Sequence, residues 1–149
     1  MPYFTRVFTA SDDTPPINDM RVLVGQYAAT ITVEGDEDDW DIAALRYDDE
    51  EEPVDIERYL PATDGLFEED INDFRSTISA YGSEAAEKVL SVLDECRQII
   101  CFRVPDEADD TVWAPLNAAV DALTHSVGGL IHAEKEGFYD GPELILPLE

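Results

Sequence analysis

Positive charge is the scarcest property of this 149-residue sequence, which has 9 lysine and arginine residues against 35 aspartate and glutamate residues. The formal net charge of -26 repels nucleic-acid phosphates and anionic lipid surfaces. We therefore expect no direct binding to nucleic acid or membrane, and a basic protein as the favoured partner. A solubility or salt adaptation of a soluble domain is the alternative explanation of the charge.

Cysteines, long apolar runs and catalytic motifs are also scarce. Cys96 and Cys101 are too few for a disulfide framework, and we interpret both as reduced and structural. No apolar run approaches the ~20 residues of a membrane-spanning helix, and the N-terminus lacks a secretion-signal pattern. No GxSxG, P-loop, GxGxxG or CxxC motif is present. The sequence thus predicts a cytoplasmic protein without a cofactor, and it does not favour an enzyme.

The apolar residues are numerous enough for a folded core. They make up 44% of the chain, so the acidity does not indicate disorder. A chain of this length is typical of one domain. We therefore predict that residues 1–149 form a single domain.

The C-terminal third carries the clearest secondary-structure pattern. Ile99–Val104 is short and apolar, which indicates a strand, and the apolar residues of Val112–Val127 have helical spacing. Gly128-Gly129 ends that helix, and strands follow at Leu130 and at Leu144–Leu146. This strand, helix, strand unit is compatible with a parallel right-handed crossover.

The patterns that precede it predict four strands and then two helices. The expected strands cover residues 3–10, 21–33, 40–47 and 54–60, and the expected helices cover 64–81, with Asp64 as N-cap, and 83–96, with Ser83 as N-cap. Strands first and helices later favour an α+β fold. We predict a mostly antiparallel sheet with three helices packed on one face.

The first acidic run, Asp36–Asp41, has some of the character of a calcium loop. An EF-hand loop that starts at Asp36 needs oxygen ligands at its fifth and twelfth positions, where this chain has Trp40 and Tyr47. We therefore interpret the run as a solvated hairpin tip.

The second acidic run, residues 48–52, lies between aromatic residues. Carboxylates interleaved with aromatic rings are typical of a surface that binds a basic partner. The predicted partner-binding residues are Trp40, Tyr47, Asp48, Asp49, Glu50, Glu51, Glu52 and Tyr59.

Two histidines and two glutamates are the remaining candidates for chemistry. His132, Glu134 and Glu136 would share one face of a strand, and His125 is near in the sequence. The four residues are candidates for a metal site or an acid-base pair, and so for a metal-dependent enzyme. No recognised motif accompanies them, and we predict no metal site.

The segment from Gly128 to Asp140, Gly-Gly-Leu-Ile-His-Ala-Glu-Lys-Glu-Gly-Phe-Tyr-Asp, resembles the ends of small acidic bacterial proteins. Some of those uncharacterised proteins look like immunity partners of toxins. The resemblance covers about thirty residues and implies no functional residue. Together with the charge, it favours an acidic binding protein, such as an immunity or antitoxin-type inhibitor of a basic protein.

Overall fold

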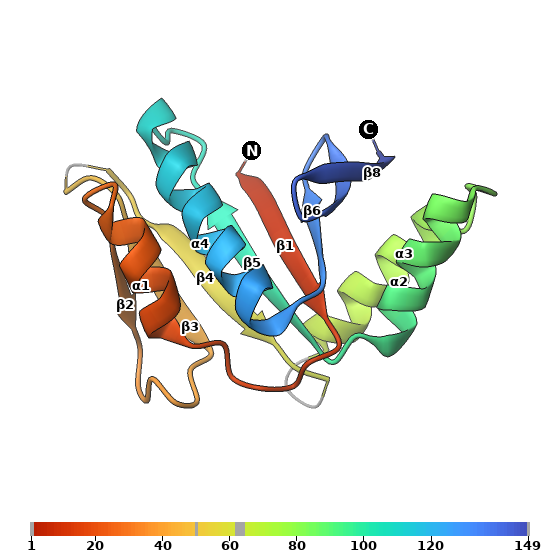
Figure 1. The fold of residues 1–149 in the computed structure, drawn as a ribbon, viewed down its shortest axis with the longest axis horizontal. Helices are drawn as coiled ribbons and strands as arrows, with labels where there is room; N and C mark the ends of the chain where they lie inside the picture. The colour runs from red at the N-terminus through yellow and green to blue at the C-terminus, as the bar shows by residue number, and fades with distance from the viewer. Residues whose placement is uncertain (1, 50, 62–64, 149) are drawn as a thin grey trace.

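A computed structural model of the chain describes residues 2–49, 51–61 and 65–148. Within these residues eight strands form one sheet in the order β2-β3-β4-β5-β1-β6-β7-β8, and each neighbouring pair is antiparallel (Figure 1). The strands are β1 (Tyr3–Thr9), β2 (Thr30–Val33), β3 (Ile42–Arg46), β4 (Val54–Tyr59), β5 (Gln98–Val104), β6 (Leu130–Ala133), β7 (Gly137–Asp140) and β8 (Glu143–Pro147). The prediction of an α+β fold with an antiparallel sheet is confirmed.

Four α-helices of the described chain cover both faces of this sheet. They are α1 (Ile17–Gly25), α2 (Leu66–Ile78), α3 (Glu84–Glu95) and α4 (Trp113–Val127), and a 3-10 turn η1 (Asp110–Val112) precedes α4. Neighbouring residues of β1 point to opposite faces: Val7 belongs to the core under α1 and α4, and Phe8 to the core under α2 and α3. The prediction of three helices on one face is not confirmed, because the helices form two pairs on opposite faces.

The strand predicted over residues 21–33 is wrong in its first half. The β-branched residues that follow Arg21 are typical of a strand. In the structure, however, Ile17, Met20 and Val24 are all buried on one side of a helix, with the spacing of helical turns. They face α4, against which α1 packs. Only the last residues of the predicted strand form β2, because the turn at residues 25–28 separates them from the helix.

Other predicted elements match the structure closely. Ser83 caps α3, since its hydroxyl oxygen accepts a hydrogen bond of 3.2 Å from the Ala86 amide. Asp64 lies outside the described residues. The strands β5 and β6 that flank α4 run in the same direction, but β1 lies between them, so they make no parallel pair. None of the described helices has the length and apolar character to cross a lipid bilayer.

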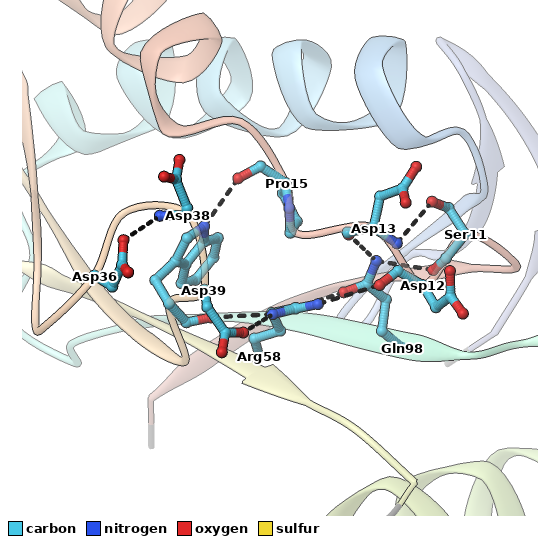
Figure 2. A network of polar contacts seen from close by, with 10 residues as sticks. Ser11, Asp12, Asp13, Pro15, Asp36, Asp38, Asp39, Arg58 and Gln98 are labelled. Atoms are coloured by element: carbon cyan, nitrogen blue, oxygen red, sulfur yellow. Dashed lines mark hydrogen bonds and ion pairs between the residues drawn. The ribbon is translucent and has the colours of Figure 1, made fainter.

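A buried arginine joins four separate segments on the α1 side of the sheet (Figure 2). Arg58 of β4 donates hydrogen bonds to the Gln98 side-chain oxygen at 2.7 Å and to the backbone oxygens of Trp40 and Asp12. Gln98 of β5 in turn donates from Nε2 to the backbone oxygens of Ser11 and Asp13. The loop before β3 and the segment after β1 are therefore held to the centre of the sheet.

The ion pair between Arg58 and Asp39 stabilises the buried arginine less than the hydrogen bonds to neutral oxygens do. Asp39 lies 3.6 Å from the Arg58 guanidinium, but its side chain is 82% exposed whereas that of Arg58 is 3% exposed. Water screens such an exposed carboxylate, so the buried carbonyl and amide oxygens supply most of the compensation for the arginine's lost hydration.

We predict that Arg58→Met destabilises the fold by about 3 kcal/mol, because it leaves several buried oxygens without a donor. Urea denaturation followed by circular dichroism measures this change. Arg103→Met is the matched control: Arg103 pairs with Asp55 at 3.7 Å, and both side chains are about half exposed, so its loss costs less than about 0.5 kcal/mol. Equal effects of the two substitutions would contradict a supporting role for the Arg58 network.

Gly129 allows α4 to lead directly into the sheet. Its φ is +103°, and a Cβ atom there would lie 2.1 Å from the backbone oxygen of Phe8. Any side chain at this position therefore pushes β6 away from β1, in addition to the strain of the left-handed backbone.

Gly129→Ala should accordingly lower the free energy of unfolding by at least about 2 kcal/mol, measured by thermal or urea denaturation. Gly82→Ala serves as the control, since nothing lies within 4 Å of the added methyl group and its φ is not in the left-handed region. A Gly129→Ala variant as stable as Gly82→Ala would disprove the close approach of the two strands.

Candidate functional site

Two acidic loops meet at one end of the sheet. β4 and β5 are antiparallel, with Asp55 opposite Arg103, so the loop before β4 and the loop after β5 leave the sheet at the same end. The Asp109 amide donates a hydrogen bond of 3.3 Å to the hydroxyl oxygen of Tyr47, which joins the two loops directly. In Figure 1 the loops that follow β3 and β5 lie on the upper side, as does the N-terminus.

We call these carboxylates the acidic end of the sheet. Neither residues 47–53 nor residues 105–110 include a lysine or arginine. All members of the set are exposed except Glu51, which is partly buried. The acidic end comprises Asp48, Asp49, Glu51, Glu52, Asp106, Glu107, Asp109 and Asp110.

The pKa of Tyr47 is affected by the carboxylates of these loops. Burial raises the pKa of its hydroxyl, and the neighbouring carboxylates of Glu51, Asp109 and Asp48 raise it further, although the hydrogen bond from Asp109 lowers it. The tyrosine therefore stays protonated at neutral pH and presents a hydroxyl beside the carboxylates.

The structure separates some of the predicted partner-binding residues from this end. Trp40 is fully buried, and its indole N–H donates a hydrogen bond of 2.9 Å to the Pro15 oxygen, so it offers no surface to a partner. Tyr59 lies at the far end of β4, about 17 Å along the strand from Val54, and packs against the α2 and α3 core. Glu50 lies outside the described residues. Tyr47 and the acidic residues beside it remain together.

The four candidate metal ligands do not come together. His132 is buried on the α2 face, whereas His125 is exposed near the end of α4 on the other face. Glu134 accepts a hydrogen bond of 2.8 Å from the Phe4 amide, and Glu136 binds two tyrosines. Among the described residues, no group of three or more His, Cys, Asp or Glu side chains is placed to hold a metal ion.

Neither cysteine is placed for nucleophilic chemistry. Both Cys96 and Cys101 are free, and burial raises the pKa of each thiol to about 11. Their thiols are therefore protonated at neutral pH, which agrees with the structural role predicted for them.

A groove of about 580 Å³ opens between α4 and the strands β1, β6 and β7. The floor is formed by apolar or small side chains of α4 and β6. The rim carries Tyr3 and Trp113, whose rings meet edge to face with centroids 5.3 Å apart. Of the described lining residues, none is a lysine or arginine, while Asp121 and Glu136 are acidic.

Glu136 is fixed in this groove by two hydroxyl groups. Tyr3 and Tyr139 each donate a hydrogen bond of 2.7 Å, one to each oxygen of the Glu136 carboxylate. Burial is the largest cause of the raised pKa of Tyr3, and the hydrogen bond to Glu136 is the largest cause of the raised pKa of Tyr139. Both hydroxyls therefore remain donors to the carboxylate of Glu136, which is an exposed residue.

The sequence patterns did not reveal this groove. Its walls come from the two ends of the chain and from α4, so no local spacing connects them, and Tyr139 looks like an ordinary hairpin residue. The only local signal in the sequence is a tryptophan, Trp113, three residues after the acidic segment that ends at Asp110.

Comparison of the chain with protein-family models, with curated proteins and with solved structures found no match.

His132 makes the stability of the protein depend on pH. Its side chain packs between Phe74 and Phe138, with ring centroids at 4.5 and 5.0 Å, and its Nδ1 has no hydrogen-bond partner in the described part of the chain. Burial lowers the pKa of His132 to about 4, and the positive charge of Arg6 adds to this effect. The folded protein therefore holds this histidine neutral.

Between pH 6.5 and 4 the unfolded chain binds a proton at His132 that the folded chain does not, so this contribution to stability is lost as the pH falls. Between pH 7 and pH 4, the free energy of unfolding of the wild-type protein should fall by up to about 3 kcal/mol more than that of His132→Phe. Urea denaturation of both proteins at several pH values measures the difference, in which the titration of the carboxylates largely cancels. A constant difference across this range would show that His132 is not buried as a neutral ring.

Proposed function

We propose that this protein acts by binding a basic protein partner at its acidic end, as an inhibitor of the immunity or antitoxin type. In this proposal the carboxylates of the two loops cover a positively charged cleft of the partner. Tyr47, which lies between the loops, contributes an aromatic ring and a hydroxyl to the interface.

The observation that carries the proposal is the uneven distribution of charge. In the described chain, six basic side chains form ion pairs with carboxylates, and one of these pairs, Arg103–Asp55, lies at the base of the two loops. The pairs are Arg6–Asp70, Arg21–Glu37, Arg58–Asp39, Arg75–Asp94, Lys88–Asp140 and Arg103–Asp55. The two loops of the acidic end concentrate eight described carboxylates in two short segments, and neither segment contains a lysine or arginine in its sequence.

Concentrated charge of one sign has a known consequence for association. It raises the rate at which an oppositely charged protein arrives, and it penalises partners of the same charge. The attraction is screened over about 8 Å at physiological ionic strength, so binding of this kind weakens as salt increases. The resemblance of the C-terminal segment to immunity-like proteins agrees with this type of partner.

The proposal is tested with two variants of equal net charge. The first neutralises the acidic end by Asp49→Asn, Glu51→Gln, Glu52→Gln and Glu107→Gln. The control neutralises four exposed carboxylates of α2 and α3 by Glu68→Gln, Asp73→Asn, Glu87→Gln and Glu95→Gln. Each protein is immobilised, exposed to lysate of the source organism and eluted with a salt gradient, and the captured proteins are identified by mass spectrometry.

We expect the wild type and the control to retain the same basic protein, and the acidic-end variant to bind the purified partner at least about tenfold more weakly. Equal weakening by both variants would show that only the total charge matters, and would overturn the proposed site. Capture of no basic protein by the wild type, together with unfolding at low salt that monovalent salt reverses, would instead support adaptation to salt.

A further inference from the structure

The groove beside α4 has the chemistry of a site for an organic cation. Apolar side chains form its floor, aromatic rings stand at its rim, and its charged residues are acidic. The floor includes Leu116, Val120, Ile131 and Ala133, and each of the four is less than a tenth exposed. Such a floor suits the methylene groups of a long basic side chain, and its rim suits the charged head.

The Glu136 carboxylate is a prepared acceptor for that head. A carboxylate has about four lone-pair positions, and Tyr3 and Tyr139 occupy one on each oxygen. The remaining positions can accept from a cationic donor, and the hydroxyls keep the carboxylate from turning away. Hydrogen bonds between charged groups are about twice as strong as neutral ones, so a fixed carboxylate favours a cationic ligand over a neutral one.

The exposed ring of Trp113 adds a second element of recognition. Its side chain is 40% exposed, which is unusual for a tryptophan, and the contact with Tyr3 holds the ring at 84° to the tyrosine plane. An indole attracts a cation that lies over its face, and guanidinium groups stack on it as well. The groove therefore combines a carboxylate, an aromatic ring and an apolar floor.

The position of the groove connects it to the acidic end. Trp113 is the first residue of α4 and follows the acidic loop at residues 105–110 after only the short turn η1. A protein that docks on the acidic end therefore has the groove within reach of the same interface. A volume of about 580 Å³ lies within the usual range of ligand pockets and exceeds the needs of one small ion.

We propose that this groove receives an arginine side chain of the basic partner protein, with its guanidinium group at Glu136 and Trp113 and its methylene groups on the floor. This inference rests on the proposed function, and it names the residue type that the partner inserts. Arginine suits the site better than lysine because its planar group pairs with a carboxylate and stacks on an indole at the same time.

The probe is the peptide acetyl-glycyl-arginyl-glycine amide, added to the full chain labelled with ¹⁵N. The chain has two tryptophans, so its two indole N–H signals report separately on the groove and on the core. We expect a saturable shift of the Trp113 signal with a dissociation constant on the order of 1 mM. The Trp40 signal should not move, because that indole is fully buried and donates to Pro15.

Three comparisons define the site. The matched peptide with citrulline, which has the shape of arginine without its charge, should bind at least about tenfold more weakly. The Glu136→Gln variant should bind the arginine peptide more weakly than the wild type by a similar factor. Glu95→Gln removes one carboxylate from the opposite face and should leave the affinity unchanged. The amide spectrum of each variant shows whether it remains folded.

Other outcomes would overturn the inference. Shifts that grow without saturation and affect the acidic end more than Trp113 would mean unspecific attraction. Spermidine binding at the groove more tightly than the peptide would make a free polyamine the occupant in place of a protein side chain. If Glu136→Gln leaves the affinity for the captured partner unchanged while the acidic-end variant lowers it, the groove inference fails and the proposed function stands.

Discussion

The insertion of β1 between β5 and β6 is the constraint on which the rest of the structure depends. This first strand pairs with residues about 90 and 125 positions later, Thr9 with Gln98 and Phe8 with Leu130. Its side chains enter both cores alternately, so each pair of helices needs β1 as part of its support. Because such distant contacts must close large loops, β1 joins the two halves of the chain at a considerable cost in conformational entropy.

The scarcity of positive charge makes the placement of each basic residue consequential. The chain buries Arg58 where it satisfies backbone oxygens of otherwise irregular segments, whereas Arg75 and Lys88 each pair with a single exposed carboxylate. Exposed pairs of this kind contribute little stability, so the two apolar cores must overcome the self-repulsion of the net charge. The two loops of the acidic end contain no lysine or arginine, so negative charge is concentrated at that end of the sheet.

The acidic end and the groove are adjacent because of the path of the chain after β5. The acidic loop leads through η1 straight into α4, whose first residue is Trp113, and the beginning of β1 brings Tyr3 to the same place. In the proposed mode of binding, a partner that is attracted by the carboxylates also meets the groove, where two tyrosines bind the Glu136 carboxylate. The proposal thus assigns long-range attraction and short-range recognition to adjacent parts of the same end.

The sequence by itself determined the elements whose burial pattern is local: the period of α4, the Ser83 cap and the apolar run of β5 were all predicted. It did not determine α1, because its β-branched residues fit a strand equally well until α4 provides a surface for the helical spacing. Tertiary structure alone decided which faces the helices cover, that Trp40 is buried, and that Tyr3, from the other end of the chain, binds Glu136. Periodicity in the sequence predicts which side of an element is apolar. Only strand order and long-range pairing determine which other elements that side packs against.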